Sequence, residues 1–472
     1  MGREKVDTDK VLNSPLETAS QEKARRDQLG SVVGGKLKLY DPQADNIKKL
    51  LDLLSRRINR FLAVSMLGCV HCGLCAEACH YSLARPDDPK MTPAYKADQV
   101  RRIFKRHLDW TGRIIPWWVH ARYPADDADL NRLKNIVFGM CSGCRRCTLN
   151  CPMGVDTASI IRFARGLLTE LGIVPEGVFN VSRDQWETGN QMAVTEQDYL
   201  ETLEWMEEEV RAELQDANVK IPVDQTGCDF MYAINPREVK FDPRSIANAA
   251  KVFHLAGEKW TLPKWGWDQT NFGLFSGDDN LGGYSARNVY EAAVRLKAKR
   301  LVISECGHGY RSTRWEGYNW ADFSQNLPAE SVVVTLIRYI QEGRIRVDPS
   351  KNPDPVTFHD SCNIARSGDL TEEPRRVLRR VCADFREMHP NRTENFCCTG
   401  GGGLLSMAEY RPLRLEVAKI KADQLKATGA KSVCTMCHNC VDGLTDVIKH
   451  YALNMKVVQI LDLVAGALVL PE

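Results

Sequence analysis

Apolar residues in the N-terminal part of the chain recur with the spacing of amphipathic helices. Between positions 46 and 66 they lie three or four residues apart, on one face of a predicted helix. That face consists of Leu50, Leu53, Leu54, Ile58, Phe61 and Leu62. Residues 157–175 show a second helical pattern that ends at Pro175, and the acidic stretch 176–222 also has helical spacing. The N-terminal part is therefore predicted to be mainly helical.

The pattern changes after position 222, where short apolar runs alternate with helical stretches. The runs RLVISEC (300–306), DPVTFHDSC (354–362) and KSVCTMC (431–437) are typical of buried strands. Helical spacing occurs in residues 286–298 and 410–429. This alternation predicts α/β units.

Composition narrows the class of protein. The chain has 472 residues, a net charge of +2 and a pI near 7.8, so no overall field favours nucleic acid. It has 17 cysteines but no apolar core of a signal peptide, which predicts a reducing cytoplasm where cysteines serve metal or redox chemistry. No apolar run reaches about 18 residues. The best one, VVQILDLVAGALVL, contains Asp462 and is predicted to be a buried helix.

Two runs of four cysteines carry the first chemical signal. Both have the spacing C-x2-C-x2-C-x3-C of bacterial ferredoxins, which bind cubane [4Fe-4S] clusters. The fourth cysteine of each run usually ligates the other cluster, so the predicted ligand sets cross over. One set is Cys69, Cys72, Cys75 and Cys151, and the other is Cys141, Cys144, Cys147 and Cys79. Zinc is the alternative, but zinc sites use two pairs of ligands rather than two runs of four.

The long insertion between the two runs has helical patterns, so this domain is expected to resemble the α-helical ferredoxins. Its basic run RRIFKRH (101–107) is predicted to be a solvated helix face, with docking of an acidic partner as the alternative.

Five further cysteines surround a run of glycines near the C-terminus. They are Cys362, Cys397, Cys398, Cys434 and Cys437. Two of them end strand-like runs, and strand ends converge in α/β folds, so the five thiols are expected at one crevice. Such a set suits an iron–sulfur assembly that is larger or more open than a four-cysteine site. The neighbouring Gly400, Gly401 and Gly402 are expected to allow close backbone approach and N–H contacts to sulfur.

The spacing C-x34-CC-x35-CxxC, with HDSCN and CCTGGGG, resembles the cysteine-rich CCG domain of the heterodisulfide reductase family. The resemblance implies a non-cubane [4Fe-4S] cluster on those five cysteines, at which a disulfide is cleaved and reduced. A ferredoxin domain followed by such a domain is similar to the catalytic subunit of membrane-associated heterodisulfide reductases. Among the subfamilies, the chain most resembles subunits of membrane complexes linked to dissimilatory sulfite reductase.

These observations predict an α+β chain of five parts. An N-terminal arm (1–45) precedes an α-helical ferredoxin domain with two cubanes (46–175) and a helical connector (176–222). A duplicated α/β CCG domain with pseudo-twofold symmetry follows, as a degenerate half (223–345) and an intact half with the non-cubane cluster (346–472).

The duplication is visible in matching segments about 130 residues apart, such as NFGLFS (271–276) and GGGLLS (401–406). Trp267 and Asp268 stand where the first half needs its cysteine pair, so that half is predicted to hold no cluster. The predicted core tryptophans, for which lining the crevice is the alternative, are Trp260, Trp265 and Trp267. Cys228 and Cys306 are expected to be buried free cysteines, with the alternative that Cys306 and His308 face the substrate.

In the intact half, Cys398 and Cys437 are the predicted catalytic cysteines. His359 is the candidate proton donor, because disulfide reduction consumes protons. The alternative is that His359 makes a structural hydrogen bond. Cys440 is expected to be a helical core residue, with a spare cluster ligand as the alternative.

The resemblance implies a subunit that reduces, or reversibly interconverts, a disulfide or trisulfide with electrons from the two cubanes. The implied partners are a cytochrome b-like, quinol-oxidising membrane subunit, other subunits of a complex, and a small sulfur-carrier protein of dissimilatory sulfur metabolism as substrate. The chain would then lie at the cytoplasmic face of the inner membrane through its partner, with the segment before Cys69 as the docking site. The alternatives are a subunit of a coenzyme M–coenzyme B heterodisulfide reductase and a non-catalytic electron-transfer subunit of a glycolate- or lactate-oxidising complex.

Overall fold

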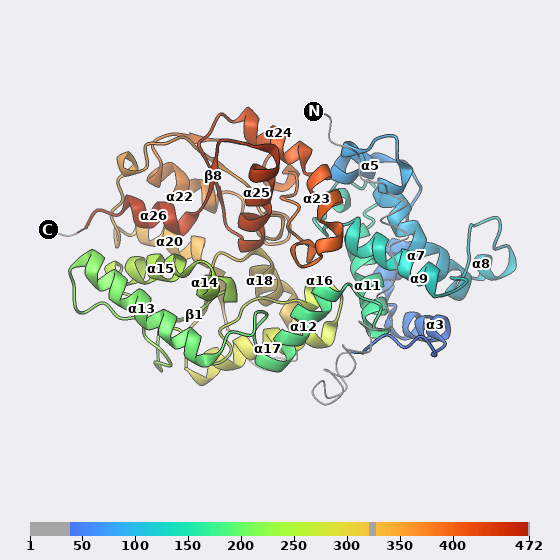
Figure 1. Ribbon diagram of the computed structural model, residues 1–472, viewed down its shortest axis with the longest axis horizontal. Coiled ribbons are helices and arrows are strands. Elements are labelled where there is room, and N and C mark those ends of the chain that lie inside the picture. The colour runs from blue at the N-terminus through green and yellow to red at the C-terminus, as the bar shows by residue number, and fades with distance from the viewer. Residues whose placement is uncertain (1–37, 321–326, 471–472) are drawn as a thin grey trace. The chain divides into compact units, whose positions relative to one another are not determined.

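A computed structural model describes residues 38–320 and 327–470 of the chain (Figure 1). Of the predicted N-terminal arm, residues 1–37 lie outside the described residues. Within the described part, the chain divides into two compact units, each built from several segments.

The first unit contains the chain up to Arg183, together with Leu274–Asp279 and Thr399–Ile420. It is helical. Its helices are α3 (Asn46–Arg57), α4 (Arg60–Leu67), α5 (Leu74–Ala78), α6 (His80–Ala84), α7 (Pro93–Leu108), α8 (Trp110–Ile114), α9 (Asp127–Lys134), α10 (Arg146–Leu149), α11 (Thr157–Glu170) and α23 (Arg411–Val417), with most of α12 (Glu176–Thr188) and α16 (Gly273–Ser276). α11 packs against α7, α4 and α3.

The helix predicted over 46–66 is two helices, because Asn59 interrupts it. The Asn59 side chain accepts a hydrogen bond from the Leu62 amide at 2.9 Å, which caps the start of α4. The break turns α4 relative to α3, so Leu50 and Leu54 are buried while Phe61 is exposed. The prediction that Phe61 shares one face with these leucines was therefore wrong.

The second unit contains Asp184–Gly273, Asn280–Cys398 and the chain from Lys421 onward. It holds two parallel four-stranded sheets, ordered β2-β1-β3-β4 and β6-β5-β7-β8. The strands are β1 (Phe230–Ala233), β2 (Trp260–Thr261), β3 (Leu301–Ile303), β4 (Ala329–Ser331), β5 (Val356–Phe358), β6 (Phe385–Arg386), β7 (Ser432–Thr435) and β8 (Lys456–Gln459). The same strand order in both sheets confirms the predicted duplication and the α+β class.

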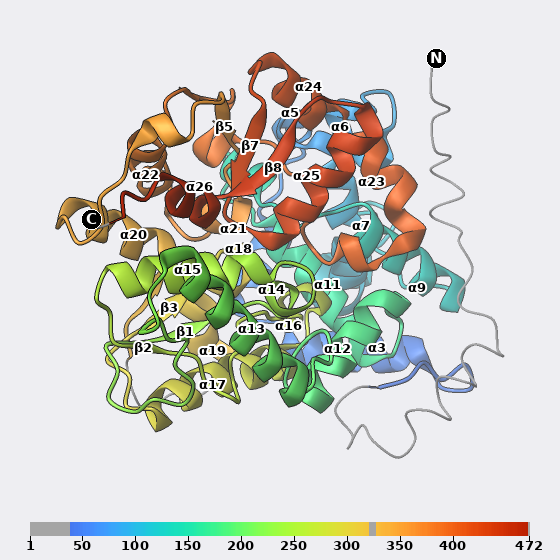
Figure 2. The same cartoon turned by 60° about the vertical axis from the view of Figure 1, so that its left-hand side comes forward.

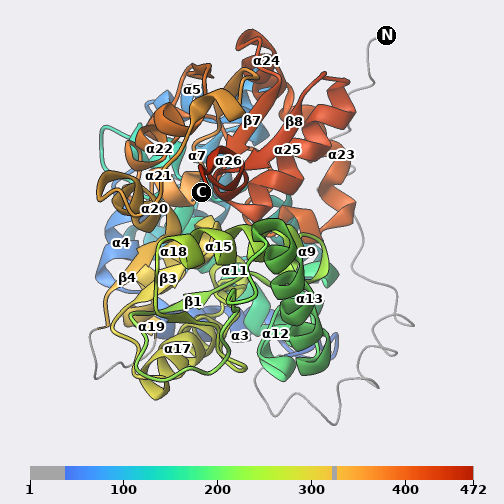
Figure 3. The same cartoon turned by 90° about the vertical axis from the view of Figure 1, so that its left-hand side faces the viewer.

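Helices flank both sheets. They are α13 (Glu196–Leu214), α14 (Pro236–Lys240), α15 (Pro243–Leu255), α17 (Asp279–Arg295), α18 (Gly307–Arg311), α19 (Gly317–Trp320), α20 (Val332–Gln341), α21 (Cys362–Ala365), α22 (Glu373–Val381), α24 (Lys419–Ala427), α25 (His438–Tyr451) and α26 (Ile460–Ala467). The first sheet lies between α15 and α17 (Figure 2), and α25 lies beside β7 and β8 (Figure 3).

Most of the apolar segment VVQILDLVAGALVL is buried, although Gly466 and Leu470 are exposed, and it is not helical from its start. Its first residues form the end of β8, and α26 begins only at Ile460. Asp462 accepts a hydrogen bond from the Gln459 amide at 2.9 Å, so this acidic residue in an apolar run caps the helix. Among the described residues, no helix has the length and apolar character needed to span a membrane.

Aromatic rings fill the core of the first half. Phe253 packs edge-on against Phe230, Tyr232 and Trp260, with ring centroids 5.0–5.2 Å apart. Trp267 stacks on Tyr199 of α13 at 4.6 Å. Trp260 and Trp267 are thus core residues, whereas Trp265 is exposed.

The two halves of the second unit are joined by buried polar contacts. The carboxylate of Glu305, just after β3, accepts hydrogen bonds from the first amides of α26, Ile460 at 2.7 Å and Leu461 at 3.2 Å. His438 of α25 contacts the Glu238 carboxylate at 3.0 Å. Because a buried carboxylate without partners is costly, these contacts fix one half on the other.

Replacing Phe253 with alanine is expected to reduce the free energy of unfolding of the second unit by about 3–5 kcal/mol, because it opens a cavity among three rings. Urea unfolding followed by tryptophan fluorescence measures this loss. Phe241→Ala is the control, since Phe241 is 70% exposed and its loss should leave the midpoint unchanged. Equal midpoints for the two variants would contradict the packing described.

Candidate iron–sulfur sites

The two ferredoxin-type cysteine runs form tight loops in the first unit. Each loop turns through residues with positive φ, Gly73 in the first run and Gly143 and Arg145 in the second. Amides approach the thiols: Gly143 donates to Cys141 Sγ and Val155 to Cys151 Sγ, both at 3.4 Å. Thiols with N–H donors directed at sulfur are the donor set that a [4Fe-4S] cluster requires.

Thiols of the two runs lie near one another, as crossed ligand sets require. Cys79 from the first run lines one pocket with three thiols of the second run, Cys141, Cys144 and Cys147. The pKa of the Cys75 thiol is raised by burial and further by its neighbours Cys69, Cys79 and Cys151. The ligand sets stay predictions, and this geometry supports them.

Two buried cations face the second cysteine run. Arg165 of α11 donates to four carbonyls, those of Val137 (2.8 Å), Phe275 (3.0 Å), Gly402 (2.8 Å) and Cys141 (2.7 Å). The Lys96 ammonium of α7 lies 4.4 Å from the centre of the Tyr81 ring. Burial raises the pKa of the Cys141 thiol, and both cations oppose that shift.

In the described part of the chain, neither Lys96 nor Arg165 forms an ion pair with a carboxylate. A buried cation needs an anion nearby, because desolvation of an isolated charge is costly. Four thiolates around a cluster supply that anion, so the two cations fit a negatively charged cluster at Cys79, Cys141, Cys144 and Cys147.

The glycine run packs within the first unit, against this same cysteine loop. A Cβ on Gly402 (φ +67) would lie 2.7 Å from the Ser142 carbonyl oxygen, between Cys141 and Gly143. Arg165 ties the two loops together through the carbonyls of Gly402 and Cys141. The described contacts of Gly401 and Gly402 are thus to the Ser142 backbone, and sulfur contacts of these glycines stay a prediction.

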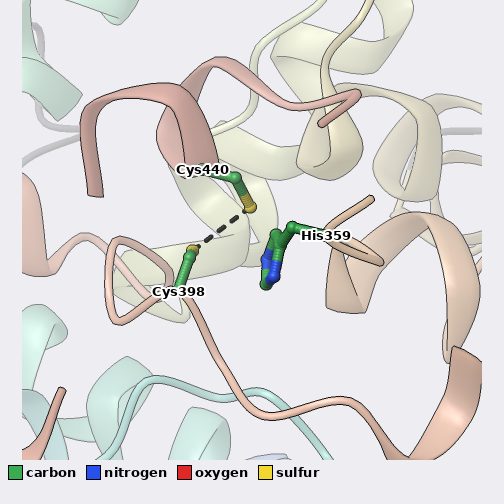
Figure 4. A group of neighbouring side chains, drawn as sticks. All are labelled: His359, Cys398 and Cys440. Carbon is green, nitrogen blue, oxygen red and sulfur yellow. Dashed lines mark hydrogen bonds between the residues drawn. The ribbon is translucent and has the colours of Figure 1, made fainter. Parts of the chain in front are cut away.

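A third group of thiols lies in the second unit. Cys398 and Cys440 have their sulfur atoms 3.2 Å apart, and a ring nitrogen of His359 lies within 4.8 Å of both (Figure 4). Cys437, which precedes α25, joins them: hydrogen bonds from Cys440 and His308 hold its pKa well below the usual value for a thiol. All of these residues are buried.

Cys362 and Cys397 lie in segments next to this group of thiols. Cys362 begins α21, and its neighbours Ser361 and Asn363 border Gly307, which lies against Cys437. Cys397 and Cys398 both act electrostatically on the buried Lys421.

Cys434 does not join this group in the structure. It lies within β7, and its thiol belongs to the apolar core. Burial raises its pKa, with further contributions from Glu305, Cys382 and Asp462 rather than from the other site thiols. Side chains alternate across a strand, so a cysteine inside β7 points to a sheet face. The ligand role of Cys434 stays a prediction, and the structure offers Cys440, which was expected in the core, as an alternative ligand beside Cys398.

Two family models match parts of the chain. A 4Fe-4S dicluster domain matches residues 65–155, and a cysteine-rich CCG domain matches residues 356–444. The chain is 28% identical to an Hdr-like menaquinol oxidoreductase iron–sulfur subunit of Archaeoglobus profundus, over 76% of this chain and 70% of the relative. It is 25% identical to one of the subunits of the dihydromethanophenazine:CoB–CoM heterodisulfide reductase of Methanosarcina mazei, over 89% of this chain and 98% of the relative. It is 23% identical to an EtfAB:quinone oxidoreductase of Syntrophomonas wolfei, over 81% of this chain and 55% of the relative.

The chain is similar to iron–sulfur subunits of the heterodisulfide reductase family. These relatives are named as oxidoreductase subunits, and both matched domains indicate iron–sulfur clusters.

The degenerate half also lines the CCG site. Cys306 Sγ lies 3.4 Å from His308 Nδ1, and His308 contacts Cys437. A Cβ on Gly307 would lie 3.3 Å from Cys437 Sγ, so glycine allows α18 to approach the thiols closely. This arrangement supports the alternative that Cys306 and His308 face the site.

A polar chain fixes the tautomer of His359. Lys421 Nζ donates to Asn395 Oδ1 at 2.7 Å, and Asn395 Nδ2 donates to the Asp360 carbonyl at 2.8 Å. The same amide nitrogen donates to His359 Nδ1 at 3.1 Å, so the Nε2 atom carries the proton of the neutral ring. Burial, assisted by Lys421, holds the pKa of His359 well below its usual value.

The HDSC loop is anchored by an ion pair. Arg375 binds both carboxylate oxygens of Asp360 at 2.8 Å. Both residues are buried. The pair holds His359 and Cys362 on either side of Asp360 in fixed positions.

Sequence reasoning missed Lys96, Arg165, Asn395 and Lys421. Each is a polar residue in an ordinary helix or loop, and only the fold brings it to a thiol. A second CxxC, Cys437-x2-Cys440, was the signal that pointed to Cys440.

Arg165→Gln is expected to lower the reduction potential of the second cubane, by an amount on the order of tens of millivolts, because a buried positive charge favours the reduced cluster. An EPR-monitored redox titration measures the shift, and Lys96→Gln should shift the potential in the same direction. Arg162→Gln on the same helix is the control, since Arg162 pairs with Asp279 at 2.7 Å. An unchanged potential with both cubane signals intact would contradict this role.

Cys440→Ala is expected to remove the iron of the CCG site, about one third of the total, while Cys434→Ala keeps it. The reason is that Cys440 contacts Cys398, whereas Cys434 lies in the core. Iron analysis and EPR of anaerobically purified protein distinguish the two variants. The opposite result, with iron lost from the Cys434 variant alone, would restore the ligand set expected from the sequence.

Proposed function

We propose that this protein is the iron–sulfur subunit that reduces, or reversibly interconverts, a disulfide or trisulfide at the CCG site. The observation that carries the proposal is the pair of imidazoles, His359 and His308, beside the buried thiols Cys398, Cys437 and Cys440. A cluster that only relays electrons needs no hydrogen-bond donors beside a substrate sulfur. Disulfide reduction produces thiolates, which such donors stabilise before the thiolates take up protons.

In this proposal, a non-cubane [4Fe-4S] cluster on the CCG cysteines would supply single electrons to a bound sulfur. Its proposed ligands are Cys362, Cys397, Cys398, Cys437 and Cys440. Cys398 and Cys437 lie at the reacting face. His359, held in its Nε2–H tautomer by Asn395, provides a hydrogen-bond donor for a sulfur that gains negative charge.

Electrons would enter through the two cubanes of the first unit. α4 exposes Phe61, Val64 and Leu67, and Val70 and Cys72 in the following cysteine loop are also exposed. An apolar surface beside a cluster site is typical of a docking surface for an electron donor. Relatives are named menaquinol oxidoreductase subunits, which favours a cytochrome b-like, quinol-oxidising membrane subunit as that donor.

The proposed substrate is a small sulfur-carrier protein of dissimilatory sulfur metabolism. The protein would then be one subunit of a complex held at the cytoplasmic face of the inner membrane by its partner. The name of the Methanosarcina mazei relative favours a coenzyme M–coenzyme B heterodisulfide as the second candidate. The name of the Syntrophomonas wolfei relative favours pure electron transfer to or from quinone as the third.

Cys398→Ser is expected to abolish disulfide reduction with a soluble electron donor, because Cys398 lies at the centre of the CCG thiols. In the oxidised wild-type protein, a substrate thiol should change the EPR spectrum. Cys228→Ser is the control: Cys228 is buried in the degenerate half, and its variant should retain the rate. Unimpaired reduction by Cys398→Ser, or a spectrum that no thiol changes, would favour the electron-transfer alternative.

A further inference from the structure

The segment that follows α7 exposes four large apolar side chains within nine residues. The exposed fractions are 70% for Trp110, 65% for Ile114, 73% for Trp117 and 76% for Trp118. Single exposed apolar residues are normal on a protein surface, but a contiguous group marks a surface that meets another molecule. Figure 1 shows this segment, with α8, extending beyond α7 and α9 of the first unit.

Hydrogen bonds to the end of α7 give the segment a defined conformation. Arg106 Nη1 donates to the Gly112 carbonyl at 3.3 Å, and Arg113 Nε donates to the His107 carbonyl at 3.0 Å. The hydroxyl of Tyr123 donates to the Arg106 carbonyl at 3.3 Å, and this closes the segment onto the end of α7. Gly112 lies so close to the Lys105 carbonyl that a Cβ would collide with it. The exposed tryptophans are therefore held in place by their own backbone.

Within residues 110–123 the charged side chains are all basic, although Asp109 directly precedes the segment as the N-cap of α8. Arg113, His120 and Arg122 are exposed, and the sequence contains no acidic residue from Trp110 to Tyr123. The last turn of α7 adds Lys105 and Arg106. The surface thus combines tryptophans with a positively charged border.

We propose that this tryptophan loop, residues 110–123, inserts into the interface of a bilayer that contains anionic phospholipid. Tryptophan is enriched where a protein meets the boundary between headgroups and acyl chains, since its ring is apolar and its N–H is polar. Arginines beside such rings meet the phosphates of anionic headgroups. The positive border and the absence of acidic residues favour this occupant over an apolar protein partner.

The membrane contact of this one loop is weak alone, because stable attachment to a membrane needs two anchoring features. It suits a subunit that a membrane partner also holds, and it would orient the first unit toward the bilayer. The inference goes beyond the proposed function, because binding to lipid does not depend on the reaction at the CCG site.

Co-sedimentation of the purified full chain with vesicles tests the proposal. The protein should bind vesicles of phosphatidylglycerol and phosphatidylcholine in equal parts, and bind vesicles of phosphatidylcholine alone more weakly. The double variant Trp117→Ala/Trp118→Ala should bind at least about tenfold more weakly, since two rings leave the interface. Arg122→Gln should weaken binding about fivefold, and only to vesicles with phosphatidylglycerol, because Arg122 is exposed beside the tryptophans.

Trp205→Ala is the matched control, because Trp205 is a 54% exposed tryptophan on α13 of the second unit. Its binding should equal that of the wild type, and all variants should retain both cubane EPR signals as proof of folding. If the wild-type chain binds neither vesicle, or the double variant binds as well as the wild type, the proposal fails. The loop would then be assigned to a protein partner. The Cys398→Ser assay uses a soluble donor, so its result is independent of this one.

Discussion

Thiolates that leave water need positive charge or hydrogen-bond donors close by, and this need organises the polar interior of both units. In the first unit, Lys96 and Arg165 are buried without carboxylate partners in the described part of the chain, and both face the second cysteine run. In the second unit, Lys421 and Asn395 lead to His359 at the thiols. The same residues that compensate charge also hold the loops, so each site is built and neutralised by one set of contacts.

Arg165 illustrates this double role. It joins the cysteine loop of Cys141 to two segments that come from distant parts of the sequence, at Phe275 and Gly402. In sequence, only three residues separate Gly402 from Cys398 of the CCG site. The glycine run therefore connects the two kinds of site along the chain, which gives its glycines a structural reason beyond sulfur binding.

Duplication explains how the second unit forms a single site from two similar halves. The first half has lost the cysteine pair, and Trp267 now stacks on Tyr199 in the core. Its turn at Cys306, Gly307 and His308 nevertheless contacts Cys437 of the second half. The first half contributes to the site although it has no cysteine pair. Gly307 allows its backbone to lie close to Cys437, and Glu305 binds the first amides of α26.

The sequence was informative where chemistry depends on local spacing. The two ferredoxin runs, the CCG pattern and the repeat all followed from cysteine intervals and strand-like runs. It was less informative where tertiary geometry decides. Asn59 splits a helical pattern into two helices, and the length of β7 determines whether Cys434 or Cys440 reaches the other thiols. The spacing of residues in the sequence does not show that Lys421 is buried beside cysteines, because only folding brings these distant segments together.

The position of iron decides whether these thiols hold clusters. Anomalous scattering from crystals of anaerobically purified protein locates iron without a substitution. We expect two iron peaks among the ferredoxin cysteines and a third in contact with Cys398, Cys437 and Cys440, with none beside the Cys434 thiol. Zinc in place of iron, or no metal beside Cys398, would contradict this expectation.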